Sequence, residues 1–358
     1  MSLTKRLLVL RAGSPSGNNL ISSLKAGDPT LFIAGCHDDA FALKRSVADA
    51  NYLMPELARP EFAEALSKVI ATAGIDLVIP NTDGDVLAIS RLSHRLACRT
   101  FLPSRGAIEH CQDKYNLTTF LHGHGIPTPE TYAVRSLADI DEIFGRLCSH
   151  DWLWCRARKG TGSAAALPVQ NPEQARAWMR YWEDVRGLPP GSFTLSEYLP
   201  GRDLMVQCLF QGGRPIIAKM FRRLTYHTLN GTPSGVSSTA IVSKMVFEPE
   251  IVKICVSAML ALEPGASCVF FADLKENEKG VACITEINAG RFSNMPTIHD
   301  RTARESMCLT YVRAALGEHF EARDPCGHAE DCYVMRERDT LPVVLKRSEL
   351  FDGFEDAR

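Results

Sequence analysis

Short apolar runs alternate with amphipathic segments over the first eighty residues. Residues 7–10 (Leu-Leu-Val-Leu) and 30–34 are typical of buried strands, and residues 18–25 between them have a helical pattern. A helix that joins two continuously apolar strands is the pattern of a parallel βαβ unit. Residues 60–74 and 75–80 add a further helix and strand. We therefore expect roughly the first 105 residues to form an open α/β domain.

Composition and charge narrow the classes of partner. The 358 residues are 45% hydrophobic and 23% charged, which predicts folded domains rather than a disordered chain. Forty Lys and Arg against 42 Asp and Glu give a formal net charge of −2. No bulk basic field therefore attracts nucleic acid or an anionic membrane. We expect a small-molecule partner, with no nucleic acid and no membrane.

Neither export nor membrane insertion is predicted. The apolar run at residues 7–10 is far shorter than the core of a signal peptide, and no segment has the apolar length of a membrane span. The twelve cysteines are scattered and contain no C-x-x-C pair, which indicates reduced thiols rather than a zinc or redox motif. These features together predict a cytoplasmic protein.

The rest of the chain is typical of an α+β body. Helical and strand patterns follow one another without an internal repeat or a long linker. Gln211-Gly-Gly213 stands between two strand patterns and predicts a hairpin. The predicted helices span residues 113–122, 139–147, 172–182 and 248–262, and the predicted strands span residues 152–156, 193–199, 204–210, 215–220, 268–274 and 281–287.

A glycine-containing basic loop follows the strand at residues 152–156. The segment from Arg156 to Ser163 reads Arg-Ala-Arg-Lys-Gly-Thr-Gly-Ser, with three cations and two glycines. A flexible loop of this composition brings backbone N–H groups and cationic side chains onto phosphate oxygens. A surface loop whose charges are solvated is the alternative interpretation.

Oxygen ligands cluster near the end of the last strand pattern. In Thr285-Glu-Ile-Asn288 the alternation of a strand puts Glu286 and Asn288 on one face, and Asp273 comes from the preceding strand. Two carboxylates and an amide oxygen suit Mg²⁺, which completes its coordination with phosphates and water. The alternative is a pair of ordinary strands with a salt bridge to Arg291.

Two turns of the first domain carry weaker signals. The turn at residues 13–17 lacks the G-x-G-x-x-G fingerprint, so we assign no dinucleotide to it. Asn81-Thr-Asp-Gly-Asp85 follows a strand, at the edge where open α/β sheets bind ligands. Its acidic pair either faces a substrate amine or forms a solvated turn that starts the next helix, and the sequence does not choose between these.

Five segments in this order resemble the ATP-grasp superfamily, which includes biotin carboxylase, D-alanine ligase and the large subunit of carbamoyl phosphate synthetase. The segments are Asp113-Lys114, Gly125-Ile-Pro-Thr-Pro129, Arg156 with its loop, Ser196-Glu-Tyr-Leu-Pro-Gly-Arg-Asp203, and Thr285-Glu-Ile-Asn288. The resemblance implies an α/β domain with an open parallel sheet, followed by an α+β ATP-grasp fold whose two subdomains clamp ATP. The implied domains are a Rossmann-like domain at residues 1–108, a small subdomain at 109–190, a large subdomain at 191–320 and a C-terminal extension at 321–358.

The resemblance also implies roles for individual residues. The phosphate contacts fall on Lys114, Arg156 and the loop Gly160, Thr161, Gly162 and Ser163; the adenine contacts on Glu197, Tyr198 and Leu199; the ribose contact on Asp203; and the magnesium ligands on Asp273, Glu286 and Asn288. Arg291 matches the arginine that stabilises the acyl phosphate or the substrate carboxylate in relatives. However, Asn288-Ala-Gly-Arg291 has one residue more than the common Asn-Pro-Arg.

Three further cations, Lys219, Arg222 and Arg223, follow a strand that borders the phosphoacceptor site in ATP-grasp relatives. Lys219 and Arg222 are either catalytic cations aimed at the transferred phosphoryl group or members of a solvated face. Residues 226–235 resemble a flap over the site.

The predicted function is that of an ATP- and Mg²⁺-dependent ligase, with Mn²⁺ as an alternative ion. A carboxylate attacks ATP to give an acyl phosphate, and an amine or a thiol then displaces phosphate. One alternative is phosphorylation of bicarbonate or carbamate, as in carbamoyl phosphate synthetase. Another is a nucleotide-binding subunit without turnover. The expected partners are a small carboxylate and an amine, and a homo-oligomer is allowed.

Overall fold

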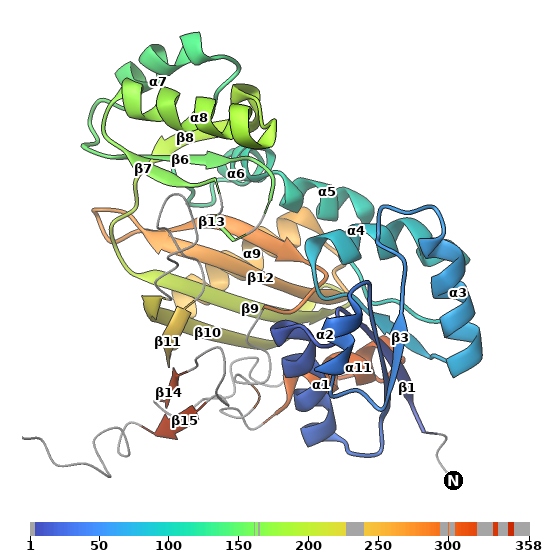
Figure 1. Ribbon diagram of the computed structural model, residues 1–358. Helices are drawn as coiled ribbons and strands as arrows, with labels where there is room; N and C mark the ends of the chain where they lie inside the picture. Colours follow the sequence, from blue (N-terminus) through green and yellow to red (C-terminus); the bar gives the residue numbers. More distant parts are fainter. Residues whose placement is uncertain are drawn as a thin grey trace, which may run out of the picture.

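The computed structural model describes residues 4–160, 162–163, 165–226, 240–293, 300, 305–320, 332–335 and 343–346. They form three sheets, which Figure 1 shows with the helices that cover them. One four-stranded sheet belongs to the N-terminal part, another to the middle of the chain, and a seven-stranded sheet to the C-terminal half. No helix within these ranges is long and apolar enough to cross a bilayer.

The N-terminal sheet is parallel, which confirms the predicted α/β domain. Its order is β3-β2-β1-β4, and all three pairs run in the same direction. Helices cover both faces, because Leu7 packs with Leu20 of α1 whereas Leu8 packs with Leu66 of α3. The elements are β1 (Arg6–Leu10), α1 (Pro15–Gly27), β2 (Phe32–His37), α2 (Ala40–Lys44), β3 (Ala50–Leu53), α3 (Phe62–Ala73), β4 (Leu77–Ile79), α4 (Asp83–Leu92) and the 3₁₀ turn η1 (Ser93–Arg95).

Helices α5 (Arg105–Gln112) and α6 (Lys114–Gly123) lead to the small sheet, at the top of Figure 1. Its order is β5-β8-β6-β7, all antiparallel, and α7 and α8 bury its outer face. Because β8 pairs within this sheet, the chain leaves the small sheet after Glu197 rather than at residue 190. The elements are β5 (Thr131–Ala133), η2 (Leu137–Asp139), α7 (Ile140–Arg146), β6 (Leu153–Ala157), β7 (Leu167–Val169), α8 (Pro172–Arg186), η3 (Pro190–Ser192) and β8 (Phe193–Glu197).

The large sheet is antiparallel, in the order β13-β12-β9-β10-β11-β14-β15. Strand alternation divides β9 between two environments. Val206 and Cys208 point into the core beneath α9, whereas Asp203 and Met205 belong to the opposite face. The elements are β9 (Asp203–Gln211), β10 (Arg214–Tyr226), β11 (Ala240–Met245), α9 (Pro249–Leu262), β12 (Cys268–Glu276), β13 (Ala282–Ala289), α11 (Met307–Ala315), β14 (Cys332–Met335) and β15 (Val343–Lys346).

Two short strands come from the predicted C-terminal extension. β14 pairs with β11, and β15 pairs with β14, so both extend the large sheet at its β11 edge. The short apolar run Leu341-Pro-Val-Val-Leu345 of this extension overlaps β15. The remainder of residues 321–358 lies outside the described part of the chain.

Candidate functional site

A cavity of about 680 Å³ lies between the small sheet, the large sheet and the N-terminal domain. This volume is within the range of about 300–1,000 Å³ that small-molecule sites occupy. It brings most of the predicted site residues together. Those that line it are Lys114, Arg156, Gly160, Gly162, Ser163, Glu197, Tyr198, Leu199, Asp203, Asp273, Glu286, Asn288 and Arg291. Thr161 and the predicted flap after Tyr226 lie outside the described residues.

The acidic side of the cavity is formed by two neighbouring strands. Asp273 of β12 stands opposite Glu286 of β13, and Phe271 stands opposite Asn288, so the three oxygen-bearing side chains share one face. A β-bulge directly after Asp273 leaves Thr285 without an opposite residue. Bulges of this kind commonly re-aim side chains next to active sites. Burial raises the pKa of Asp273 above its ordinary value.

These oxygens suit a magnesium ion. The described residues contain no cluster of three His, Cys, Asp or Glu side chains, so a site made of such ligands alone is absent there. Asp273, Glu286 and Asn288 instead offer two carboxylates and an amide. Mg²⁺ is commonly bound by one or two carboxylates together with phosphates and water, so the donor set fits that ion.

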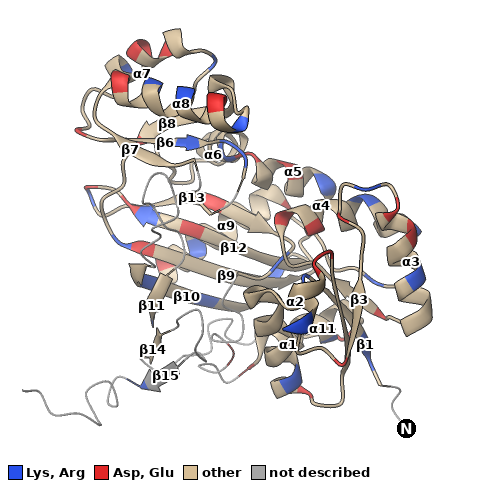
Figure 2. Ribbon diagram, in the orientation of Figure 1, with Lys and Arg blue, Asp and Glu red and all other residues tan. Residues whose placement is uncertain are grey.

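Cations from the small subdomain face this acidic side, and Figure 2 shows the basic segment of β6 above the acidic segments of β13 and β12. Arg156 donates from Nη2 to the Thr285 carbonyl oxygen at 3.0 Å, while its buried Nε–H has no partner among the described residues. Burial lowers the pKa of Arg156, although Glu286 opposes that shift. Buried donors are normally hydrogen-bonded, so the free Nε–H is suited to an anionic ligand.

Lys114 connects the start of α6 to the basic loop. Its Nζ donates to the Gly160 carbonyl oxygen at 2.7 Å and lies 3.6 Å from a Glu286 oxygen. The loop itself is sharply bent, because Gly160, Gly162 and Ser163 have φ angles of 111°, 73° and 55°. Left-handed conformations at successive positions are typical of loops that wrap around phosphate groups.

The segment predicted to bind adenine lies where the chain passes from the small to the large sheet. The Glu197 side chain is partly desolvated, and burial raises its pKa. The Lys275 ammonium lies 5.3 Å above the centre of the Tyr198 ring, and the Trp154 ring lies 6.1 Å away. Asp203 begins β9 next to this segment. The sheet change therefore brings the predicted base and ribose contacts to one end of the cavity.

Arg223 of β10 lines the cavity, whereas Lys219 and Arg222 of the same strand, the two residues predicted as catalytic, do not. The Arg223 guanidinium donates to Asp203 at 2.9 Å and to Asp273 at 2.5 Å. Burial would lower the pKa of Arg223, but these two carboxylates outweigh that effect and raise it. Tyr226 also donates to Asp203 from its hydroxyl. The sequence placed Arg223 among the three cations of this segment, but only Lys219 and Arg222 were predicted as catalytic.

Lys219 and Arg222 do not line the cavity, and their catalytic role stays a prediction. Arg222 is exposed, because it points to the opposite side of β10 from Arg223. Lys219 is on the same side as Arg223 but farther along the strand, and its Nζ lies 2.7 Å from Asp300. It is only 5% exposed, so this buried ion pair occupies its charge.

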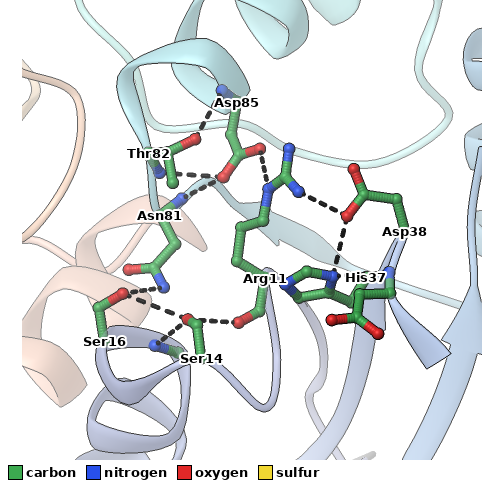
Figure 3. A network of polar contacts seen from close by, with 10 residues as sticks. Arg11, Ser14, Ser16, His37, Asp38, Asn81, Thr82 and Asp85 are labelled. Carbon is green, nitrogen blue, oxygen red and sulfur yellow. Dashed lines mark hydrogen bonds and ion pairs between the residues drawn. The ribbon is translucent and has the colours of Figure 1, made fainter. Parts of the chain in front are cut away.

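The N-terminal domain supplies residues that the motifs did not identify. Ser16, Asn81, Thr82 and Asp83 line the cavity. Figure 3 shows the polar network behind them: the Asn81 amide donates to Ser16 Oγ at 3.0 Å, and Asp85 accepts from the backbone of Asn81 and Thr82. Arg11 lies 3.2 Å from Asp85. The carboxyl ends of β1 and β4 are thereby held in one arrangement.

The two carboxylates of the Asn81–Asp85 turn have different surroundings. Asp85 is fully buried and, with Thr82, forms the capping box of α4. Asp83 instead faces the cavity, where its Oδ1 lies 2.5 Å from Arg291 Nε. The turn therefore starts the next helix, as one interpretation predicted, although Asp85 is buried rather than solvated, and it presents the Asp83 carboxylate to the cavity.

Gly290 directs Arg291 toward the N-terminal domain. It has a φ of 79°, and a β-carbon at this position would lie 2.9 Å from a Leu102 methyl group. The extra residue in Asn288-Ala-Gly-Arg291 therefore turns the chain just after β13. As a result, Arg291 contacts both Asp83 and the Asn288 side chain, the latter at 2.6 Å.

Solved structures of several enzymes have a similar fold. Biotin carboxylase from Campylobacter jejuni is 12% identical, with a TM-score of 0.74 over 93% of this chain and 76% of that one. L-amino acid ligase from Bacillus licheniformis is 14% identical, with a TM-score of 0.70 over 93% and 79% of the two chains. Carboxyaminoimidazole ribonucleotide synthase from Aspergillus clavatus, solved with ATP, is 15% identical, with a TM-score of 0.69 over 92% and 81%.

The chain has the ATP-grasp fold. The fold class predicted from the sequence is thus confirmed, with the ATP-grasp subdomains following the α/β domain. No protein-family model matches the sequence, and no curated protein matches it significantly. The similarity is therefore one of structure, at 12–15% identity.

Proposed function

We propose that the protein is an ATP- and Mg²⁺-dependent ligase that activates a carboxylate as an acyl phosphate. The observation that carries this proposal is the pairing of Asp273, Glu286 and Asn288 with Arg156 and Lys114 across one cavity. Oxygen ligands on one side and phosphate-binding cations on the other are the two requirements of phosphoryl transfer. The ATP-grasp fold is consistent with that chemistry.

The proposed reaction has two steps. A carboxylate oxygen attacks the γ-phosphorus of ATP, the bond from that phosphorus to the bridging oxygen breaks, and ADP leaves with its negative charge. An amine, or a thiol, then uses its lone pair to attack the acyl carbon. Inorganic phosphate leaves with the carbon–oxygen bond electrons, and the proton of the nucleophile passes to phosphate or water.

The chain's own residues position groups and neutralise charge in the first step. Arg156 would bind phosphate oxygens through its unpartnered Nε–H, and Lys114 through its ammonium, which lines the same cavity. Arg223, between Asp203 and Asp273, is aimed at the region where the transferred phosphoryl group would lie. A fixed cation there stabilises charge that develops in the transition state. Arg291 would orient the acceptor carboxylate.

Magnesium fits the remaining oxygens. Asp273, Glu286 and Asn288 would hold the ion, which would neutralise the β- and γ-phosphate oxygens when bound. Arg223 already contacts Asp273, so the carboxylate would be shared between the guanidinium and the ion. One of the similar structures, a biotin carboxylase domain, was solved with MgADP and bicarbonate bound.

The proposal is tested by Mg²⁺-dependent conversion of ATP to ADP in the presence of pooled carboxylates, amines, thiols and bicarbonate, with products identified by mass spectrometry. Glu286→Gln should reduce turnover at least tenfold, because a neutral amide binds Mg²⁺ less well than a carboxylate. Glu278→Gln is the matched control, since Glu278 is exposed in the turn between β12 and β13. Equal turnover in Glu286→Gln and wild type, or ATP binding without turnover for every pool, would refute the ligase assignment.

A further inference from the structure

At the end of the cavity next to the N-terminal domain, one ion pair joins two domains. Asp83 and Arg291 come from different domains, and their side chains are 24% and 10% exposed. Both line the cavity. The pair therefore presents a negative and a positive group next to each other, at the end of the cavity opposite the predicted adenine contacts.

Asp83 is not required to cap its helix. Thr82 accepts from the Asp85 backbone, and the Asp85 side chain accepts from the Thr82 backbone, so the capping box is complete without Asp83. The side chain of Asp83 contacts Arg291 instead. Because a cap does not explain this carboxylate, its position in the cavity points to recognition of a ligand.

We propose that the carboxylate substrate is an α-amino acid, whose carboxylate binds Arg291 and whose ammonium binds Asp83. This proposal rests on the proposed ligase function. An α-amino acid carries its two charges on groups attached to one carbon atom. They lie as close together as the charges of Asp83 and Arg291, whose Oδ1 and Nε are 2.5 Å apart. Each charge of the substrate thus meets its opposite.

A substrate with no ammonium group is disfavoured by the same pair. A plain carboxylate or bicarbonate that binds Arg291 adds a second negative charge beside Asp83, with no cation to balance it. Like charges at this distance repel, and a half-buried carboxylate that loses its partner is costly. The pair therefore selects for zwitterions and against simple anions.

The pair also determines which group of the amino acid reacts. Arg291 contacts Asn288, a proposed magnesium ligand, so a carboxylate held by Arg291 lies next to the site of the γ-phosphate. The substrate nitrogen is an ammonium on Asp83, and it has no lone pair with which to attack an acyl carbon. The amino acid is consequently phosphorylated on its carboxylate, and the nucleophile of the second step comes from another molecule.

Hydroxylamine trapping tests this assignment without knowledge of that second molecule. Hydroxylamine attacks the acyl phosphate, releases phosphate and leaves a hydroxamate that is quantified by mass spectrometry. The wild-type protein is supplied with Mg-ATP and either the common α-amino acids or their counterparts that lack the amino group. Variant Asp83→Asn is compared with Glu64→Gln, which removes a charge from the exposed first turn of α3 in the same domain.

We expect hydroxamates from one or more amino acids and little from their desamino counterparts. The ratio of kcat/KM for an amino acid to kcat/KM for its desamino counterpart should fall about 10- to 150-fold in Asp83→Asn. This is the contribution of one charge-assisted hydrogen bond. The ratio should be unchanged in Glu64→Gln. If Asp83→Asn does not fold, Asp83→Ser replaces it.

Two results would overturn the amino-acid assignment while leaving the ligase function intact: equal hydroxamate yields from both substrate classes, or an amino-acid preference that survives in Asp83→Asn. ADP formation from neither class, nor from bicarbonate or any other carboxylate of the pooled assay, in protein that still binds ATP by calorimetry, would overturn the ligase function itself. The two failures are therefore distinguishable.

Discussion

Asp300→Asn should destabilise the protein by about 3–5 kcal/mol, the penalty for breaking a buried ion pair from one side. Asp300 accepts from the side chains of Lys219, Ser23 and Ser306 at 2.7, 2.5 and 2.6 Å, and from the first backbone N–H groups of α11. It therefore connects β10, α1 and α11. The substitution leaves the Lys219 ammonium, which is 5% exposed, without a counter-charge.

The double variant Lys219→Met/Asp300→Asn should recover most of that loss. Removing both charges leaves no uncompensated ion, and replacement of a buried pair by groups of similar volume is often close to neutral. Asparagine also keeps an oxygen for the N-terminus of α11. We expect the double variant to lie within about 1–2 kcal/mol of wild type, and thus a coupling energy of several kcal/mol between the two positions.

Urea unfolding at pH 7, followed by far-UV circular dichroism, measures these differences. Circular dichroism is preferable to tryptophan fluorescence because all four tryptophans lie between residues 152 and 182, in the small subdomain. An Asp300→Asn protein within 1 kcal/mol of wild type would refute the structural role of the pair. A Lys219→Met protein that folds normally but loses ATP turnover would support the predicted catalytic role of Lys219.

Three further predictions follow from single contacts. Burial would raise the pKa of Asp300, but Lys219 and neighbouring donors outweigh it and lower that pKa to about 2, from an ordinary value of 3.8. The ionised carboxylate therefore stabilises the fold fully above pH 3.8, and this stabilisation is lost as the pH falls toward 2. The urea midpoint should consequently drop between about pH 4 and 2 more steeply in wild type than in Lys219→Met. Gly290→Ala should cost about 2–4 kcal/mol in urea unfolding, from a left-handed φ and a β-carbon crowded against Leu102, and should raise the KM for the carboxylate because Arg291 is displaced. Arg223→Lys should reduce kcat about 10- to 100-fold in folded protein, since one ammonium does not reproduce the two-carboxylate contact of the guanidinium; an unchanged kcat would exclude Arg223 from catalysis.

The parts of the fold that depend on local pattern were predictable from the sequence. The buried runs that became β1, β2 and β4 are apolar on both faces, a property that parallel sheets covered by helices require. The turn Gln211-Gly-Gly213 indicated the hairpin of β9 and β10. Alternation along β13 put Glu286 and Asn288 on one face, and the structure has both in the cavity.

Arg223, rather than Arg222, faces the cavity because of a change in strand register. The hairpin begins with Arg214 opposite Gln211, and an unbroken ladder would bring Arg222 opposite Asp203. A bulge between Pro215 and Ile217 shifts the pairing by one residue, so that Arg223 takes that place. A one-residue shift moves side chains to the other face of a strand. Pro215 is the one sequence feature that marks this bulge, because proline within a sheet is confined to edges, strand starts and bulges.

The cavity residues of the N-terminal domain could not be predicted, because their position depends on contacts between distant segments of the chain. Asp83 and Arg291 are 208 positions apart, and nothing in either local pattern indicates that they meet. The one signal was the extra residue in Asn288-Ala-Gly-Arg291, whose glycine permits the turn that aims the arginine. The turn brings Arg291 to Asp83 because α4 packs against β13, a contact that no local sequence pattern indicates.

Isotope transfer measures directly whether a carboxylate oxygen attacks the γ-phosphorus of ATP. The substrate identified in the pooled assay is labelled with ¹⁸O in its carboxylate, and the inorganic phosphate is analysed by mass spectrometry after turnover. We predict one ¹⁸O atom in each phosphate released. Unlabelled phosphate, or label in AMP, would contradict it, because the carboxylate oxygen would then never have been bonded to the γ-phosphorus.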